Sequence, residues 1–97
     1  MITSKQRAHL RAMANTIVSV QQIGKGGIAD NLIKQLDDAL EAREIIKVTV
    51  LETALLTARE ACEICAEKLF AEPVQCIGSK FVLYRRARNP KNRKIKI

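Results

Sequence analysis

Residues 16–36 read TIVSVQQIGKGGIADNLIKQL, and this stretch decides the fold. Its first part, 16–23, is rich in β-branched residues, which predicts a strand. The residues Gly24-Lys25-Gly26-Gly27 follow directly, and from Ile28 onward apolar residues recur at helical spacing. A strand, a glycine loop and a helix in direct succession indicate an α/β unit, in which a right-handed crossover leads to a second, parallel strand.

The flanking sequence extends this pattern in both directions. Thr3 and Gln6 form a capping-box pair, which predicts a helix of about three turns after Thr3. The second helix is predicted to begin at Ile28 and to end near Ala42 or Arg43. The remaining predicted elements are a strand over 45–51, a helix over 53–70, and strands over 74–77 and 81–85 around a Gly78-Ser79 turn.

These elements predict the order α-β-α-β-α-β-β. We expect a single compact α/β domain with a four-stranded mixed sheet, whose helices pack mainly on one face. From residue 88 onward the chain shows no period and is rich in Lys, Arg and Asn. We therefore predict a domain over residues 1–87 and a flexible basic tail over 88–97.

The charges are segregated along the chain, whose formal net charge is +7. Residues 1–27 carry four basic side chains and no acidic one, and residues 73–97 carry eight basic side chains and no acidic one. All ten acidic residues lie between 28 and 72, together with five basic ones. Two basic ends that a fold brings together would form one basic face, which is typical of a polyanion-binding protein.

Length and composition restrict the function classes. A chain of 97 residues has room for about one core, which argues against a multi-domain enzyme. The longest uncharged stretch, 12–24, is shorter than the roughly 20 apolar residues of a membrane helix. No targeting segment is visible, and an odd number of three cysteines suits a reducing compartment, so we expect a cytoplasmic protein and, by default, a monomer.

The glycine loop suits the binding of phosphate, because glycines allow close backbone approach and the next helix directs its free N–H groups at the loop. The loop does not match a P-loop, which needs Gly-Lys-Ser/Thr after four residues. Gly24, Gly26 and Ala29 match the dinucleotide fingerprint, with Glu52 as the ribose acid. That small nucleotide-binding enzyme remains the alternative, although the chain is too short for a second nucleotide-binding half.

A Gly-x-x-Gly loop that clamps an RNA backbone is the third interpretation, beside a plain turn with no ligand. Here the sequence resembles a known family, the CRM domain (chloroplast RNA splicing and ribosome maturation), and within it the single-domain bacterial YhbY-like RNA-binding proteins. The matching stretches are 3–7 with Leu10-Arg11, 23–27, 39–48, 75–78 and 82–85.

The resemblance implies a fold similar to the C-terminal domain of translation initiation factor three. It implies a non-enzymatic protein that binds ribosomal RNA or precursors of the large ribosomal subunit during assembly, without a cofactor, a metal or a membrane. The RNA-binding residues it implies, together with the charge pattern, are Gly24, Lys25, Gly26, Gly27, Lys5, Arg7, Arg11, Arg85, Arg86 and Arg88.

The other chemically notable residues favour structural roles. Cys62 and Cys65 fall on the apolar stripe of the third helix and are interpreted as core residues, since a zinc site would need two more ligands. Phe70 is also expected in the core. With few aromatic side chains for stacking, backbone recognition is expected rather than the reading of unpaired bases. A DNA-binding role is disfavoured, because the second and third helices are rich in acids.

Overall fold

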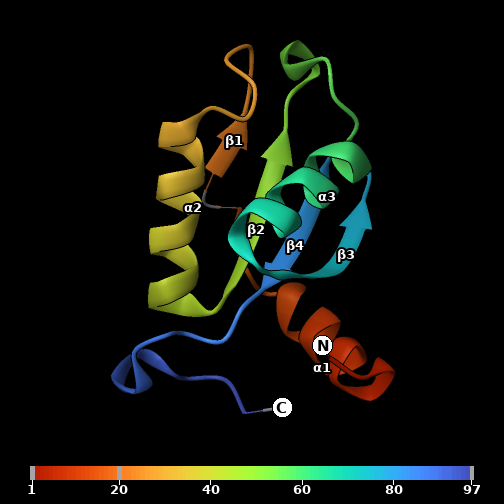
Figure 1. Ribbon diagram of the computed structural model, residues 1–97. Helices are drawn as coiled ribbons and strands as arrows, with labels where there is room; N and C mark the ends of the chain where they lie inside the picture. The colour runs from red at the N-terminus through yellow and green to blue at the C-terminus, as the bar shows by residue number, and fades with distance from the viewer. Residues whose placement is uncertain (1, 20, 97) are drawn as a thin grey trace.

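A computed structural model describes residues 2–19 and 21–96 (Figure 1). The predicted order of helices and strands is confirmed, with two short 3₁₀ helices added. The elements are α1 (Ser4–Ala14), β1 (Gln21–Ile23), α2 (Asp30–Arg43), β2 (Ile45–Val50), η1 (Glu52–Ala54), α3 (Ala58–Leu69), β3 (Glu72–Ile77), β4 (Lys80–Tyr84) and η2 (Pro90–Asn92). No helix in the described part of the chain is long and apolar enough to cross a membrane.

The four strands form one mixed sheet in the order β1-β2-β4-β3. β1 and β2 are parallel, with Ile23 opposite Val50, as the crossover through α2 predicts. β4 lies antiparallel to both β2 and β3, so the hairpin predicted at Gly78 adds the other half of the sheet. The φ of +59° at Gly78 explains the glycine in that turn.

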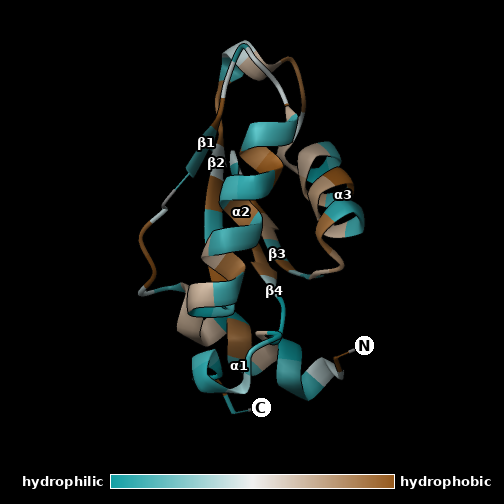
Figure 2. Cartoon of the chain, turned by 60° about the vertical axis from the view of Figure 1, so that its left-hand side comes forward, coloured by the Kyte–Doolittle hydropathy of each residue, from teal (hydrophilic) through white to brown (hydrophobic). Residues whose placement is uncertain are grey.

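The two faces of the sheet are covered unequally. α2 and α3 pack on one face, where alternate residues of β2 such as Ile46 and Val48 meet Leu36 of α2 and Cys65 of α3. α1 packs on the other face through Leu10 and a smaller cluster of residues. Figure 2 shows the hydrophilic outer side of α2 and the hydrophobic strands behind it. The predicted packing of the second and third helices on one face is confirmed.

Two predicted boundaries are wrong. The strand expected over 16–23 is reduced to Gln21–Ile23, although Val20 lies outside the described residues. The hydroxyl of Ser19 shares a 2.7 Å hydrogen bond with the hydroxyl of Thr49. The third helix begins at Ala58 and not near residue 53, because Thr57 and Glu60 form a capping box there.

Three non-glycine residues end helices in the left-handed region, where a β-carbon is unfavourable. Glu44 ends α2 with a φ of 67°, Leu55 ends η1 with a φ of 57°, and Phe70 ends α3 with a φ of 54°. Glycine usually occupies such positions. Only Glu44 is buried, whereas Leu55 and Phe70 are 92% and 86% exposed.

The buried side chain of Glu44 binds the C-terminal segment, which we define as residues 87–96. Its carboxylate accepts hydrogen bonds from the backbone N–H groups of Ala87 at 2.8 Å, Lys94 at 2.6 Å and Ile95 at 2.9 Å. Burial raises the pKa of Glu44, but these three hydrogen bonds outweigh it and leave the pKa below its usual value. Glu44 therefore stabilises its strained backbone position through long-range contacts.

Glu41, one turn earlier on α2, binds the same segment. It accepts hydrogen bonds from the backbone N–H groups of Arg88 at 2.8 Å and Asn89 at 3.0 Å, and from the side-chain amide of Asn92 at 3.0 Å. The sequence shows no sign of these contacts. The division into a domain over 1–87 and a flexible tail over 88–97 stays a prediction, but acidic residues of α2 hold most of this segment on the domain.

The two carboxylates predict acid-sensitive docking of the C-terminal segment. The hydrogen bond from Asn92, followed by those from Arg88 and Asn89, lowers the pKa of Glu41 to about 2 from 4.5. A carboxyl group whose pKa is lower in the folded state than in the unfolded state stabilises the fold at pH values above its unfolded pKa. This stabilisation is lost as the pH falls through the folded pKa. We expect the amide NMR signals of Arg88 and Asn89, which donate to Glu41, to move to unfolded positions as the pH falls from 4.5 to about 2.

Glu44→Gln should release the end of the segment at neutral pH, because the amide can replace only part of the acceptor capacity of the carboxylate. We expect the free energy of unfolding in urea to fall by about 1–3 kcal/mol. Glu63→Gln on the exposed side of α3 is the matched control, with a change within about 0.5 kcal/mol. Equal stability of the two variants would contradict the assigned role of Glu44.

Candidate functional site

The glycine loop is a tight turn at the end of β1. The N–H of Gly27 donates to the carbonyl oxygen of Gly24 at 2.9 Å, and the φ of Gly27 is +66°. A side chain at residue 27 would therefore be strained. The loop lies at the top of Figure 1, beyond the sheet, beside the segment that contains η1.

The surroundings of the loop differ from one glycine to the next. A β-carbon at Gly24 would contact the side chains of Leu51 at 3.5 Å and Thr53 at 3.6 Å. A β-carbon at Gly26 would meet no atom of the described structure within 4 Å. The middle of the loop, with the exposed Lys25, thus faces solvent and is open to a ligand.

The N-terminus of α2, which follows the loop, has features that favour and features that disfavour the binding of an anion. Ala29 caps α2 without a side-chain hydrogen bond, which leaves N–H groups of the first turn available. The amide of Leu32 already donates to the side-chain oxygen of Asn31 at 2.9 Å. Asp30 places an exposed carboxylate in the same turn, where it stabilises the helix but repels an anionic ligand.

The basic residues of α1 lie far from this loop. Figure 1 shows α1 at the bottom of the molecule and the glycine loop at the top. Lys5 and Arg11 are exposed, whereas Arg7 donates through Nε to the carbonyl oxygen of Pro73 at 3.2 Å. The side chain of Arg7 also pairs with Glu72 at 4.0 Å. α1 and the C-terminal segment thus share the lower end of the molecule, away from the glycine loop (Figure 1).

Arg85 is buried and serves the fold. Its Nη1 donates to Oδ1 of Asp37 at 2.6 Å and to the carbonyl oxygen of Leu69 at 3.0 Å, and its Nη2 donates to the carbonyl oxygen of Asp37 at 3.2 Å. Only 8% of the residue is exposed. These contacts occupy Nη1 and Nη2, and the buried Nε has no hydrogen-bond partner among the described residues. Because it is buried, Arg85 presents almost no surface to a phosphate, contrary to the RNA contact that the sequence predicts.

The neighbouring arginines remain accessible. Arg86 is exposed, and the side chain of Arg88 is 62% exposed although it donates to both oxygens of Asp37, at 3.0 and 3.3 Å. The hydrogen bond from Arg88 lowers the pKa of Asp37, burial raises it, and Arg85 lowers it further, so the carboxyl stays ionised. One carboxylate thus neutralises part of the charge of two arginines.

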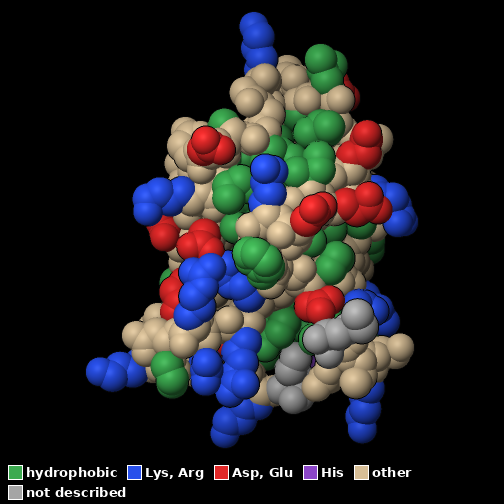
Figure 3. Space-filling model, in the orientation of Figure 1, with side chains coloured by type: hydrophobic (Ala, Val, Ile, Leu, Met, Phe, Trp, Pro, Cys, Tyr) green, Lys and Arg blue, Asp and Glu red, His purple; other side chains and the backbone are tan. Residues whose placement is uncertain are grey.

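A groove of about 760 Å³ opens at the lower end of the molecule. It lies between α1, the end of α3 and the C-terminal segment, and Figure 3 shows Lys and Arg side chains gathered around this end. Its lining includes Gln6, Phe70, Tyr84, Arg86, Ile95 and Lys96, together with the acidic Glu72 and the buried Arg85. Sequence reasoning missed it because its walls come from both ends of the chain.

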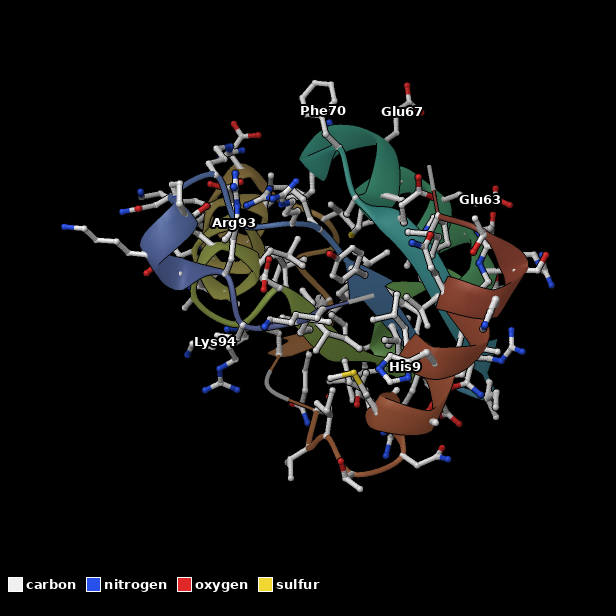
Figure 4. All side chains as sticks on the ribbon, turned by 90° about the horizontal axis from the view of Figure 1, so that it is seen from below. His9, Glu63, Glu67, Phe70, Arg93 and Lys94 are labelled. Carbon is white, nitrogen blue, oxygen red and sulfur yellow. The ribbon has the colours of Figure 1, made fainter. Side chains whose placement is uncertain are left out.

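Phe70 stands at the rim of this groove. The sequence predicts it in the core, but 86% of it is exposed and its ring projects away from the end of α3 (Figure 4). The reason is its position after the last turn of α3, where the backbone turns left-handed and directs the side chain outward. Phe81, by contrast, is fully buried.

The cysteines form part of the core. Cys62 and Cys65 are 4% and 0% exposed and pack among the residues of the main cluster, as predicted. Burial raises the pKa of both thiols to about 11. Within residues 2–19 and 21–96, no group of three or more His, Cys, Asp or Glu residues is placed to hold a metal ion. His9 is exposed on α1 (Figure 4).

The burial of Arg85 predicts a structural phenotype. Arg85→Lys keeps the charge but cannot reach both Asp37 and Leu69 with a planar fork. We expect the free energy of unfolding in urea to fall by about 2–4 kcal/mol, near the cost of breaking a buried ion pair. The adjacent exposed residue gives the matched control, Arg86→Lys, with a change within about 0.5 kcal/mol. Similar losses in both variants would refute this role.

Comparison with known proteins agrees with this architecture. The solution structure of the hypothetical protein SAV1595 from Staphylococcus aureus superposes with a TM-score of 0.75 and 42% sequence identity, over 99% of this chain and 100% of that one. The "Probable RNA-binding protein YqeI" of Bacillus subtilis is 41% identical over 91 residues, which are 94% of this chain and 95% of that protein. An "RNA-binding protein" of Haemophilus influenzae is 29% identical over 84 residues, 87% of this chain and 85% of that protein.

The family model of the CRS1/YhbY (CRM) domain matches residues 2–85. This range runs from the residue before the capping box of α1 to the buried arginine after β4, and it includes the glycine loop and the whole sheet. The sequence match, the sheet order and the structural likeness agree, and the chain belongs to the CRS1/YhbY (CRM) domain family.

Proposed function

We propose that this protein binds RNA without catalysing a reaction, and that the glycine loop grips the phosphate backbone. The observation that carries the proposal is the open position of Gly26 and Lys25 at the end of the sheet, in a chain of net charge +7 whose relatives are named as RNA-binding proteins. Backbone N–H groups of the loop and the charge of Lys25 supply the contacts that a phosphate requires.

A second set of contacts is proposed at the lower end of the molecule. Lys5, Arg7 and Arg11 of α1, with Arg86 and Arg88, supply counter-charge to further phosphates. Arg85 is left out because it is buried and both of its Nη atoms are bound.

The finer part of the proposal concerns the RNA. We infer ribosomal RNA, in precursors of the large subunit during assembly, as the partner of a cytoplasmic monomer. The support is the resemblance of the loop and its flanking segments to YhbY-like proteins. The nucleotide-binding alternative lacks support, because β1 and β2 are the single parallel pair of strands in the described sheet and a dinucleotide fold needs two such halves.

The loop predicts a charge-specific effect of substitution at residue 26. Gly26→Asp should weaken the binding of a ribosomal RNA fragment about tenfold, because the carboxylate would face the bound phosphate. Gly26→Ser is the matched control, since the open space admits either side chain. We expect both variants to melt close to the parent protein. Unchanged affinity of a folded Gly26→Asp protein, measured by fluorescence anisotropy, would exclude the loop from the interface.

Asp30 allows the opposite test. Asp30→Asn removes the carboxylate beside the loop, so the affinity for RNA should rise a few-fold while the free energy of unfolding falls by about 0.3–1 kcal/mol. Asp38→Asn, on the same helix two turns away, should leave the affinity unchanged. The gain should shrink as salt concentration increases. A loss of affinity in Asp30→Asn would contradict phosphate binding at this helix end.

A further inference from the structure

Phe70 carries two unfavourable features at one residue. An aromatic side chain that is 86% exposed gains little from burial, and a φ of 54° is unfavourable for a bulky residue. The backbone hydrogen bonds of the turn do not require a bulky aromatic side chain at this position. The N–H of Phe70 donates to the last turn of α3, and the N–H of Ala71 donates to the carbonyl oxygen of Ala66 at 2.9 Å, bonds that glycine would make equally well.

The comparison with Glu44 shows what is unusual. Glu44 has a similar left-handed backbone, but its side chain is buried and binds three amides of the C-terminal segment. The ring of Phe70 has no such role in the fold, since it projects into solvent at the rim of the groove (Figure 4). A strained and exposed aromatic residue at a groove is typical of a residue kept for contact with a ligand.

The charges around the groove indicate the kind of ligand. Arg86 and Lys96 line it and are exposed, and no hydrogen bond or ion pair of their side chains is found within the described residues. Glu72 of β3 and the buried Arg85 line the groove as well, so basic side chains outnumber the single carboxylate of the lining. Figure 4 places Arg93 and Lys94 on the C-terminal segment at one side of Phe70, and Glu67 on α3 at the other. A negatively charged chain would therefore run along the side of the C-terminal segment, with the ring of Phe70 beside it.

We propose that this groove binds an unpaired nucleotide of an RNA, with the ring of Phe70 stacked on the base and with Arg86 and Lys96 in contact with the neighbouring phosphates. The proposal rests on the RNA binding proposed above and adds a single-stranded element to the RNA. Stacking on one ring is sequence-tolerant, because every base has a π-face. The scarcity of aromatic residues predicts no reading of unpaired bases, yet one exposed ring suffices for one nucleotide.

Two RNAs and three variants test the proposal. The probes are a fully paired hairpin and the same hairpin with a single-stranded 3′ extension, at equal salt concentration. The parent protein should bind the extended RNA about tenfold more tightly, the effect of stacking one base. Phe70→Gly should remove this preference and keep the affinity for the paired hairpin, whereas Phe70→Trp should retain the preference.

Leu55→Gly is the matched control, because Leu55 is equally exposed and left-handed but lies at the other end of the molecule. It should keep the preference for the extension. Both glycine variants should melt at or above the temperature of the parent protein, because the strain at each position is relieved. A loss of binding therefore cannot be assigned to unfolding.

The outcomes separate the two proposals. If Phe70→Gly keeps the preference for the extended RNA, or loses the same affinity for both RNAs, the proposed role of the groove is wrong. The proposed function would remain in place. A parent protein that binds both RNAs equally would lead to the same conclusion. Failure to bind either RNA would overturn both proposals. A photo-crosslink from 5-iodouridine in the extension to Phe70, mapped by mass spectrometry, would support the groove directly.

Discussion

The hydrogen bonds of one buried guanidinium hold the separate layers of this protein in place. Arg85 follows β4 and joins the side chain and carbonyl of Asp37 in α2 to the last carbonyl of α3. The backbone N–H of Arg85 donates to the carbonyl oxygen of Glu44, the residue that ends α2. Both helices on the main face of the sheet are thus fixed to the strand they cover. Breaking the contact would leave a half-buried carboxylate and a free carbonyl next to the core.

The consequences continue into the C-terminal segment. Because Arg85 fixes the end of α2, the carboxylates of Glu41 and Glu44 are positioned to accept hydrogen bonds from backbone N–H groups of residues 87–95. That segment forms one wall of the groove below Phe70. Acidic residues from the middle of the chain therefore form a docking site for the basic end of the same chain.

Local patterns predicted most of the fold and little of the groove. The capping box at Thr3, the helical periods and the Gly78 turn are local signals, and each element they predicted is present. Residue type suggests a surface arginine at Arg85 and a core phenylalanine at Phe70, whereas the structure buries Arg85 and exposes Phe70. The burial of Arg85 depends on a partner 48 residues away, and the exposure of Phe70 depends on a left-handed helix end. Neither feature is visible in a short stretch of sequence.

The separation of the glycine loop from the groove has a consequence for the size of any RNA that touches both. They lie at opposite ends of a molecule whose longest dimension is 36 Å. A short oligonucleotide reaches one end at a time. A longer or folded RNA can engage both, so that the second contact is made at the high local concentration created by the first. The sheet between them would then fix the distance between the two contacts, so that RNAs would be selected by the spacing of the segments that bind the loop and the groove.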